Sequence, residues 1–430
     1  MEANVTGQNE TTRERTRFVP FILIVSLFFL WGIANNLNDV LVAQFRKTFV
    51  LDDLESGLVQ SAFYFGYFLF ALPASLFMRR YGYKAAVALG LCLYGIGALL
   101  FYPAAELRVY GFFLGSLFVI ASGLAFLETS ANPLVTVLGS ARNAERRLNF
   151  VQAFNSLGAI SGALIGRQFI LSGIDYTPAQ LTAMPHVQVV RYYASESHAV
   201  QGPYLVLGAF VLFWMLLVLG VRFPSVAAAH IKDEEAISLR ESFMRLLKRG
   251  HYLFGVVAQF FYVGAQVGVW SFMIRYAERD VPHMTEKLAA AYLTGTLVAF
   301  MIGRFSGTAA MGIVRPNRLL VIFSAINVAL TLIAALVGGQ VGLYALVATS
   351  FFMSIMFPTI FASALRGLGP LTKSASSFLI MSIVGGAVLT AVMGWVSDMT
   401  DIRYAMLVPT MCFAVVFAFA ASVRREVLAP

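Results

Sequence analysis

The chain has 430 residues, of which 59% are hydrophobic and 12% are charged, and its mean hydropathy is +0.77. An ordinary soluble domain carries roughly 45–50% apolar and about 25% charged residues, so these values exclude a soluble globular protein and indicate a membrane protein. The net charge of +9 comes from basic residues scattered through short loops, a pattern that indicates orientation in a membrane rather than binding to nucleic acid.

Twelve apolar segments are long enough to cross a bilayer, which requires about 20 residues. They cover residues 18–44, 54–78, 83–103, 108–138, 145–173, 202–223, 251–277, 287–313, 317–337, 341–367, 373–398 and 403–424. Most of the 31 Lys and Arg residues fall in loops that alternate along the chain, so the positive-inside rule predicts an even number of spans with both termini in the cytoplasm. The sequence therefore predicts an all-α membrane protein with twelve transmembrane helices.

The longest cytoplasmic connection divides these spans into six and six. We expect a cytoplasmic tail at 1–17, a six-helix bundle at 18–223, a cytoplasmic linker at 224–250, a second six-helix bundle at 251–424 and a short tail at 425–430. Within the linker, the stretch SLRESFMRLLKRG predicts a surface helix over 238–248, in either a hinge-like connection or a solvated tether. Two bundles with a substrate site between them are one recurrent plan of transporters.

Two carboxyl groups stand out in the apolar segments. Asp39 follows Asn35 and Asn36 by one helical turn, so the three share a face. Because a carboxylate deep in the bilayer costs about 2.5–3.5 kcal/mol, Asp39 faces a wet cavity, finds a partner or holds a proton, unless it lies in headgroup water at the outer end. Glu128 has Asn132 at i+4 and no basic residue on its segment, so desolvation favours its protonated form. Its function is either proton binding or an interhelical hydrogen bond.

Amide and phenol side chains recur at helical spacing on three other segments. They are Gln60, Tyr64 and Tyr67 on the second, Gln152, Asn155 and Ser156 on the fifth, and Gln259, Tyr262, Gln266 and Trp270 on the seventh. A single such amide is as often a hydrogen bond between helices, worth about 1 kcal/mol, but several converging stripes predict a substrate site. Polar groups beside an indole ring suit a small neutral sugar, because they bond its hydroxyls while the ring covers its C–H face.

Few cations are placed to bind an anionic substrate. Arg275, at the outer end of the seventh segment, and Arg304, in the eighth, are expected either to pair with a carboxylate in one transport state or to reach the headgroups. The two cysteines and five histidines form no metal-ligand pattern, and the chain has no phosphate-binding loop and no nucleophile–base set. We therefore expect an uncharged substrate, no metal, no bound cofactor and no enzymatic activity.

At these residues the sequence resembles the fucose–proton symporter family of the major facilitator superfamily. The matching stretches, spread over about residues 18–425, are LFFLWGIANNLNDVLVAQF, GLVQSAFYFGYF, GLAFLETSANPLVTVLG, NFVQAFNSLGAI, AQFFYVGAQVGVWSFMIRYA, YLTGT with IGRFSGT, and FPTIFA. The resemblance implies two bundles that rock about a central site and import L-fucose with protons. It implies that Asp39 and Glu128 are the proton-coupling carboxylates and that Asn155 lies in the sugar site, near Gln152 and Asn36. Met356 and Phe357 replace a more polar pair, which leaves the identity of the hexose open.

The sequence thus predicts a proton-coupled monosaccharide symporter of the bacterial inner membrane. We expect a functional monomer, surrounded by lipid, that imports L-fucose or a closely related hexose by alternating access with co-transported H⁺. The predicted substrate-binding residues are Asn35, Asn36, Gln60, Tyr64, Asn132, Gln152, Asn155, Gln259, Tyr262, Gln266 and Trp270. One alternative is a sodium-coupled carrier or a uniporter for glucose, galactose or mannose. Another is a drug–proton antiporter, although the amide-rich stripes favour a small hydroxylated ligand.

Overall fold

The computed structural model describes most of the chain as helix. It covers residues 21–428 except 38–39, 42–43, 46–47, 50–52, 139, 171–175, 177 and 222–238. Asp39, the predicted tail at 1–17 and the first part of the predicted linker lie outside the described residues. Ten described segments are long and apolar enough to cross a membrane. The prediction of an all-α membrane protein is confirmed.

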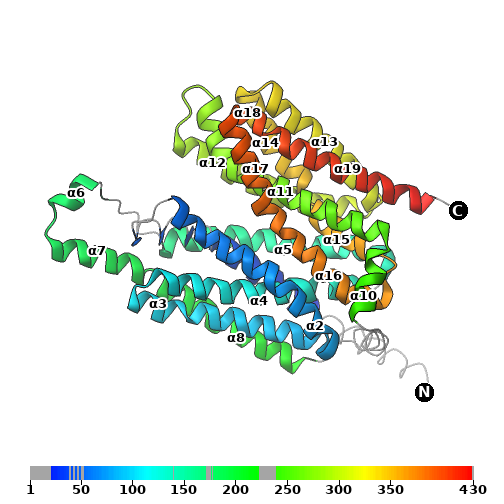
Figure 1. Ribbon diagram of the computed structural model, residues 1–430, viewed down its shortest axis with the longest axis horizontal. Helices are drawn as coiled ribbons and strands as arrows, with labels where there is room; N and C mark the ends of the chain where they lie inside the picture. Colours follow the sequence, from blue (N-terminus) through cyan, green and yellow to red (C-terminus); the bar gives the residue numbers. More distant parts are fainter. Residues whose placement is uncertain are drawn as a thin grey trace, which may run out of the picture.

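The first half of the chain supplies six passes, beginning with the helix Phe21–Leu37. Helix α2 (Asp53–Leu99) turns back at Gly82, so it contains the second pass and most of the third (Figure 1). The φ of 82° at Gly82 is a left-handed conformation that favours glycine. The further helices are α3 (Phe101–Leu107), which completes the third pass, α4 (Tyr110–Val137), α5 (Ala144–Ile165) with a π-helical end (Gly166–Ile170), and α8 (Gln201–Gly220).

The second half supplies the other six passes, and each of the last three consists of two consecutive helices. Three helices come first: α11 (Gly250–Asp280), α12 (Glu286–Ala310) and α13 (Pro316–Leu336). The tenth pass consists of α14 (Gly339–Met353) and α15 (Met356–Leu365), and the eleventh of α16 (Thr372–Met381) and α17 (Gly385–Met399). The last consists of α18 (Ile402–Ala405) and α19 (Leu407–Leu428). With α2 counted as two passes, the described residues contain the twelve passes that the sequence predicts.

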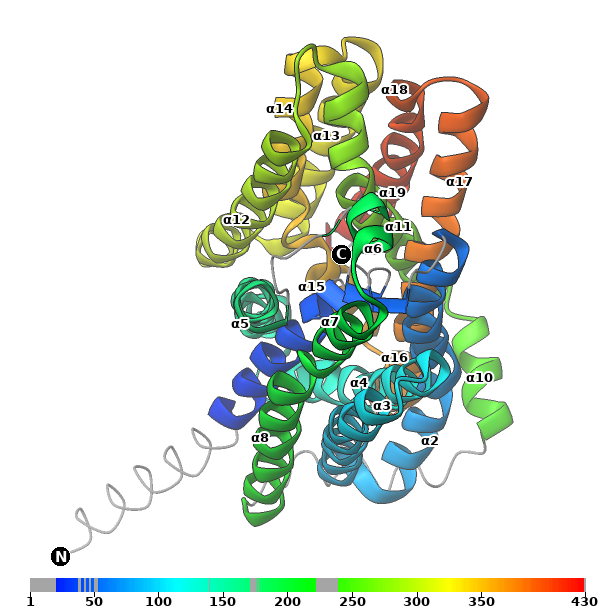
Figure 2. The ribbon, with the colours of Figure 1, turned by 90° about the vertical axis from the view of Figure 1, so that its left-hand side faces the viewer.

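The two halves lie side by side as separate groups of helices. In Figure 1, α3, α4 and α8 lie below, and α13, α14 and α19 lie above. The end view in Figure 2 places α5 beside α12, where the two groups meet. In addition, α5 packs against α15, and α2 and α4 pack against α16. These elements therefore form the interface between the halves.

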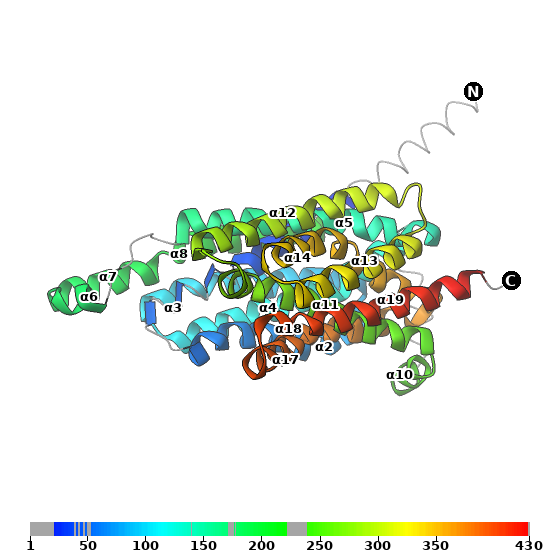
Figure 3. The same cartoon turned by 90° about the horizontal axis from the view of Figure 1, so that it is seen from above.

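Helices that do not cross the membrane project from both ends of the molecule. Figure 3 shows α6 (Pro178–Ala183) and α7 (His186–His198) at one end and α10 (Leu239–Leu247) at the other. The sequence predicts α10 closely but not α7. Helix α7 is held by Gln44, whose Nε2 donates to the Glu196 carboxylate at 2.8 Å and to its backbone oxygen at 2.9 Å. This contact between distant residues stabilises a segment that the sequence analysis leaves between the fifth and sixth predicted spans.

Backbones come into contact where the first and fifth passes cross. A Cβ added at Gly158 would lie 2.0 Å from the Phe29 carbonyl oxygen, and one added at Gly32 would lie 2.1 Å from the Asn155 carbonyl oxygen. Small residues allow such close packing between membrane helices. The crossing therefore fixes Asn155 against the helix that carries Asn35.

We predict that Gly158→Ala destabilises the protein, because the new methyl group forces the two helices apart. Overpacking of this kind costs about 1–3 kcal/mol, and the melting temperature of the purified protein should fall by several degrees. Gly115→Ala on α4 is the matched control, since a Cβ there meets nothing within 4 Å. Equal melting temperatures for the two variants would contradict the proposed close packing.

Candidate functional site

A cavity of about 620 Å³ lies between the two halves of the chain. The helix Phe21–Leu37, α2, α4 and α5 line one side, and α11, α12 and α17 line much of the other. This volume falls within the range of about 300–1,000 Å³ that is typical of small-molecule sites. The cavity is therefore large enough for a monosaccharide-sized ligand.

Eight of the predicted site residues line this cavity. They are Asn35, Asn36, Tyr64, Glu128, Gln152, Asn155, Gln266 and Trp270. These residues come from five passes, so polar side chains that are far apart in the sequence converge on one space. Gln60 belongs to α2, but its side chain, like Asp39, lies outside what the structure describes.

The two walls of the cavity differ in chemistry. The wall from the first half carries most of the polar groups, including Tyr67 and Ser156 beside the predicted residues. The wall from the second half is largely apolar, with Val263, Val267, Leu293, Leu297, Phe300, Phe357 and Ile383. Hydroxyl groups of a ligand can exchange hydrogen bonds with the first wall, while its C–H surface packs on the second.

Glu128 is the acidic residue in the described lining of the cavity. Its side chain is only 5% exposed. The Tyr67 hydroxyl donates to Oε1 at 3.3 Å, while Oε2 is buried with no hydrogen-bond partner among the described residues. A buried carboxylate with so few donors is costly to keep charged, so this geometry favours binding of a proton at Glu128.

Asn132 does not line the cavity, although the sequence predicts it there. It is fully buried, and its Oδ1 accepts a hydrogen bond from Nε2 of Gln152 at 3.0 Å. The i+4 spacing predicts that Asn132 shares the face of α4 that carries Glu128, but its side chain faces α5 rather than the cavity. Asn132 therefore orients a cavity residue instead of meeting a ligand directly.

Gln259 and Tyr262 also lie outside the cavity lining. Gln259 is fully buried, with neither amide atom hydrogen-bonded among the described residues. The Tyr262 hydroxyl donates to the Met353 carbonyl oxygen at 3.1 Å, between α11 and α14. Only Gln266 and Trp270 of the α11 stripe reach the cavity, because the first part of the stripe packs within the second half.

Arg304 lies inside the protein and not with the basic residues of the loops. Its Nε donates to the Ser354 carbonyl oxygen at 2.8 Å, and its Nη1 donates across the interface to the Gln152 carbonyl oxygen at 3.0 Å. Pro358 has no N–H for the Ser354 carbonyl, so Arg304 satisfies a carbonyl that the helix leaves unpaired. Arg275, by contrast, is exposed and lies over the Phe272 ring at 5.0 Å.

Aromatic residues that the site prediction omitted complete the lining. Trp31 lies one turn before Asn35, and Phe357 extends the apolar wall. Trp270 donates its indole N–H to the Ser350 hydroxyl at 3.1 Å, which fixes the ring at the cavity. Met356, in contrast, is fully buried in the core. The sequence could have identified Trp31, because Trp31 lies at helical spacing from Asn35. In contrast, the sequence alone does not show which way Phe357 faces.

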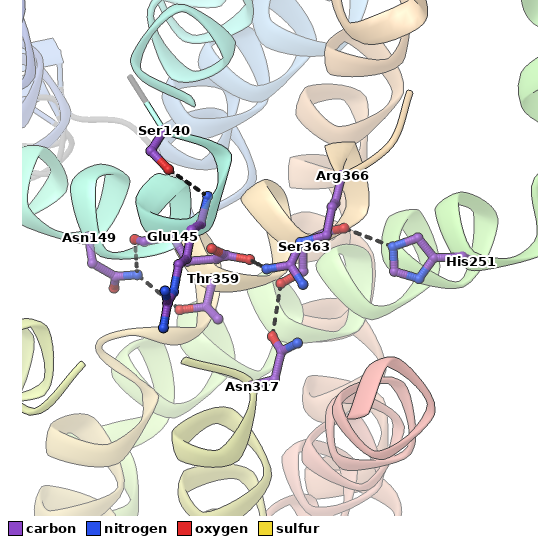
Figure 4. A network of polar contacts seen from close by, with 9 residues as sticks. Ser140, Glu145, Asn149, His251, Asn317, Thr359, Ser363 and Arg366 are labelled. Carbon is purple, nitrogen blue, oxygen red and sulfur yellow. Dashed lines mark hydrogen bonds and ion pairs between the residues drawn. The ribbon is translucent and has the colours of Figure 1, made fainter. Parts of the chain in front are cut away.

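Polar contacts between the halves gather at one end of the molecule, which we call the α10 end. Figure 4 shows that Arg366, just after α15, forms an ion pair with Glu145 on α5. Beside it, Nδ2 of Asn149 donates to the Thr359 hydroxyl at 2.9 Å. Glu145 is 1% exposed and Arg366 is 41% exposed. These contacts hold the halves together between the cavity and the α10 end.

Comparison with known proteins finds a matching family model, similar transporters and a similar solved structure. Residues 21–386 match the family model of the Major Facilitator Superfamily. The L-fucose-proton symporter of Escherichia coli (strain K12) is 46% identical over 95% of this chain and 94% of that protein, and the glucose/galactose transporter of Brucella abortus biovar 1 (strain 9-941) is 36% identical over 94% of each. A crystal structure of a major facilitator superfamily transporter in the outward conformation matches with a TM-score of 0.87, at 46% identity over 95% of this chain and 99% of that one.

We predict that Asn132→Ala weakens ligand binding although Asn132 does not line the cavity, because the Gln152 amide loses its acceptor. A net hydrogen bond is worth about 0.5–1.5 kcal/mol, so the affinity for a ligand of the cavity should fall about threefold to tenfold in an equilibrium binding assay. Ser130→Ala on the same helix is the control, since among the described residues Ser130 donates to the carbonyls of Phe126 and Leu127 on its own helix. An unchanged affinity in the Asn132 variant would show that Gln152 needs no such support.

Proposed function

Because this chain belongs to the major facilitator superfamily and to its fucose–proton symporters, we propose that it imports L-fucose or a closely related hexose together with protons. The similarity to the E. coli L-fucose-proton symporter extends over 95% of this chain. The proposal makes the chain a secondary active transporter in which the proton is the co-transported ion.

The observation that carries the proposal is the position of Glu128. Its carboxyl group lies in the wall of a sugar-sized cavity, and Tyr67 is the donor that the structure gives it. Arg304 lines the same cavity but donates to backbone carbonyl oxygens. A proton is therefore the natural means of neutralising Glu128. We propose that Asp39, which the family resemblance pairs with Glu128, is the second coupling carboxyl.

The two walls of the cavity suit a deoxysugar. Asn35, Gln152 and Asn155 provide amide groups for hydroxyls, and Trp270 provides a ring for the C–H face of the sugar. The apolar wall, including Phe357, matches a methyl group better than a hydroxymethyl group. Met356 and Phe357 stand where a fucose–proton symporter is expected to have a more polar pair, and of these two residues only Phe357 lines the cavity. This chemistry favours L-fucose over L-galactose.

The basic residues suggest the orientation of the carrier. Five basic residues lie near the α10 end: Arg79 and Arg80 just before the turn of α2 at Gly82, Arg146 in the first turn of α5, and Lys248 and Arg249 between α10 and α11. We therefore propose that this end faces the cytoplasm, as do both termini. We further propose a functional monomer in the bacterial inner membrane, with bundles at 18–223 and 251–424 joined by the linker at 224–250. In this orientation the contacts of Figure 4 close the cytoplasmic side.

Transport then requires protonation and sugar binding to favour the same rearrangement of the two halves. A ligand shifts a conformational equilibrium only through its different affinity for the two states. With Glu128 protonated and the sugar bound, the cavity can close without trapping a charged carboxylate. The Glu145–Arg366 pair and the Asn149–Thr359 hydrogen bond must separate before the cavity opens to the cytoplasm. Each inward charge gains about 2.3 kcal/mol per 100 mV of membrane potential.

The function is tested by adding sugars to weakly buffered, de-energised cells that express the chain and by following the external pH. We expect L-fucose to make the medium alkaline without sodium, and D-glucose, D-galactose and D-mannose to act more weakly. We expect Glu128→Gln to keep exchange of L-fucose between equilibrated pools but to lose accumulation against a gradient, because the amide cannot bind the proton.

Two outcomes would contradict this proposal. Sodium-dependent uptake without a pH change would indicate a sodium-coupled carrier, and full accumulation of sugar by the Glu128→Gln variant would remove that carboxyl from the coupling. Ser130→Ala on the same helix is the matched control for expression and folding.

The ion pair at the cytoplasmic end predicts unequal effects of its two neutral variants. Arg366→Gln leaves the buried Glu145 carboxylate unpaired, whereas Glu145→Gln leaves a cation that is already 41% exposed. Removing one partner of a fully buried pair costs on the order of 3–5 kcal/mol, and the exposure of Arg366 lowers this cost through solvent screening. Because Glu145 itself is buried, we expect a lower melting temperature for Arg366→Gln than for Glu145→Gln. The double variant should recover part of the loss. Equal melting temperatures for both single variants would mean that Glu145 is not held as a buried charge.

A further inference from the structure

The surface of α10 carries features that the transport cycle does not use. One face packs on the protein, since Ser242 and Leu246 are buried and Phe243 makes an edge-to-face contact with Phe378 at 5.2 Å. The neighbouring face leaves Met244 47% exposed and Leu247 61% exposed. In Figure 3, α10 is seen nearly end-on while most of the spanning helices run across the view. A short helix across the ends of the spans, with exposed apolar residues and cations, is typical of an interfacial helix.

A cationic pocket of about 410 Å³ lies directly beside this helix. Its charged lining consists of Arg245, Lys248 and Arg249, and the rest is the loop from Gly367 to Leu371. The carboxylate nearest in sequence, Glu241, pairs with Arg245 at 2.6 Å and does not line the pocket. The pocket therefore presents a surplus of positive charge to an anion.

The pocket lies at the ends of two membrane-spanning segments, a level at which phospholipid headgroups are expected. Arg249 immediately precedes α11, which begins at Gly250, and the loop follows the end of α15 at Leu365. Both walls thus lie where spans leave the hydrocarbon region. In the proposed orientation, on which this inference rests, that level is the inner leaflet, where basic side chains attract anionic lipids.

We propose that this pocket binds the phosphate headgroup of an anionic phospholipid, whose acyl chains cover Met244 and Leu247. A soluble phosphate would satisfy the cations but would leave these two apolar side chains in water. The combination of a cationic pocket and an adjacent exposed apolar face fits a lipid better than a free anion.

Binding there would also strengthen the closed cytoplasmic side. Ser242 on α10 accepts a hydrogen bond from Nη1 of Arg79 at 3.2 Å, and the same Nη1 donates to the Ser374 hydroxyl on α16 at 3.3 Å. Helix α10 therefore contacts both halves of the chain. A lipid that fixes α10 against the loop from Gly367 to Leu371 would favour the state in which these contacts are intact.

The test uses the purified full-length protein, delipidated in detergent, with melting temperatures measured during titration with dioleoylphosphatidylglycerol, dioleoylphosphatidylcholine or inorganic phosphate. We expect saturable stabilisation by phosphatidylglycerol alone. Lys248→Gln/Arg249→Gln should weaken its apparent affinity on the order of tenfold, because two of three pocket cations are removed. Arg315→Gln/Arg318→Gln, which removes two exposed cations near the start of α13, should keep the affinity.

A second variant separates a lipid from a free anion. Leu247→Ser should weaken the effect of phosphatidylglycerol while all pocket cations remain. Equal stabilisation by inorganic phosphate, equal stabilisation by phosphatidylcholine, or equal loss in the Arg315/Arg318 control would each overturn the proposal. Uptake of L-fucose into phosphatidylcholine vesicles tests the transport function separately, because it requires no anionic lipid.

Discussion

A carboxyl group inside a membrane needs a proton, a cation or water, and this requirement at Glu128 governs the chemistry of the cavity. The structure contains a buried cation in the same lining, Arg304, yet it directs the guanidinium to two backbone carbonyl oxygens. If Arg304 paired with Glu128, the carboxylate would be neutralised permanently and would have little reason to bind a proton. Separation of these charges therefore leaves Glu128 free to respond to protons.

The location of Arg304 follows from a break in the backbone of the tenth pass. Pro358 cannot donate to the Ser354 carbonyl, and an unsatisfied carbonyl in a membrane is costly. Arg304 supplies the missing donor at 2.8 Å and extends to Gln152 on the other half. Asn132 holds the side chain of that same Gln152. The missing N–H at Pro358 thus explains why Arg304 and Gln152, from different halves, meet in the lining of the cavity.

The sequence predicts the spans and the faces of helices well, because apolar length and the helical repeat are local properties. Asn35, Gln152 and Asn155 therefore reach the cavity as predicted. A stripe shows which residues share a face but not which neighbour that face meets, and for this reason Asn132 and the first part of the α11 stripe face other helices. Helix α7 and the position of Arg304 depend on contacts between residues far apart in the chain, so the sequence alone could not reveal them.

The polar contacts between the halves differ in kind from the closest backbone contacts within the first half, and this difference makes a moving carrier physically reasonable. Within the first half, Gly158 and Gly32 bring backbones into contact, and no water can replace such packing without separating the helices. Between the halves, Asn149 meets a hydroxyl and the partly exposed Arg366 meets a carboxylate, and water can take over each of these bonds. In the proposed transport cycle, opening of the α10 end exchanges these hydrogen bonds for hydration and also separates apolar side chains such as Leu365 and Leu379, which share a core with the first half.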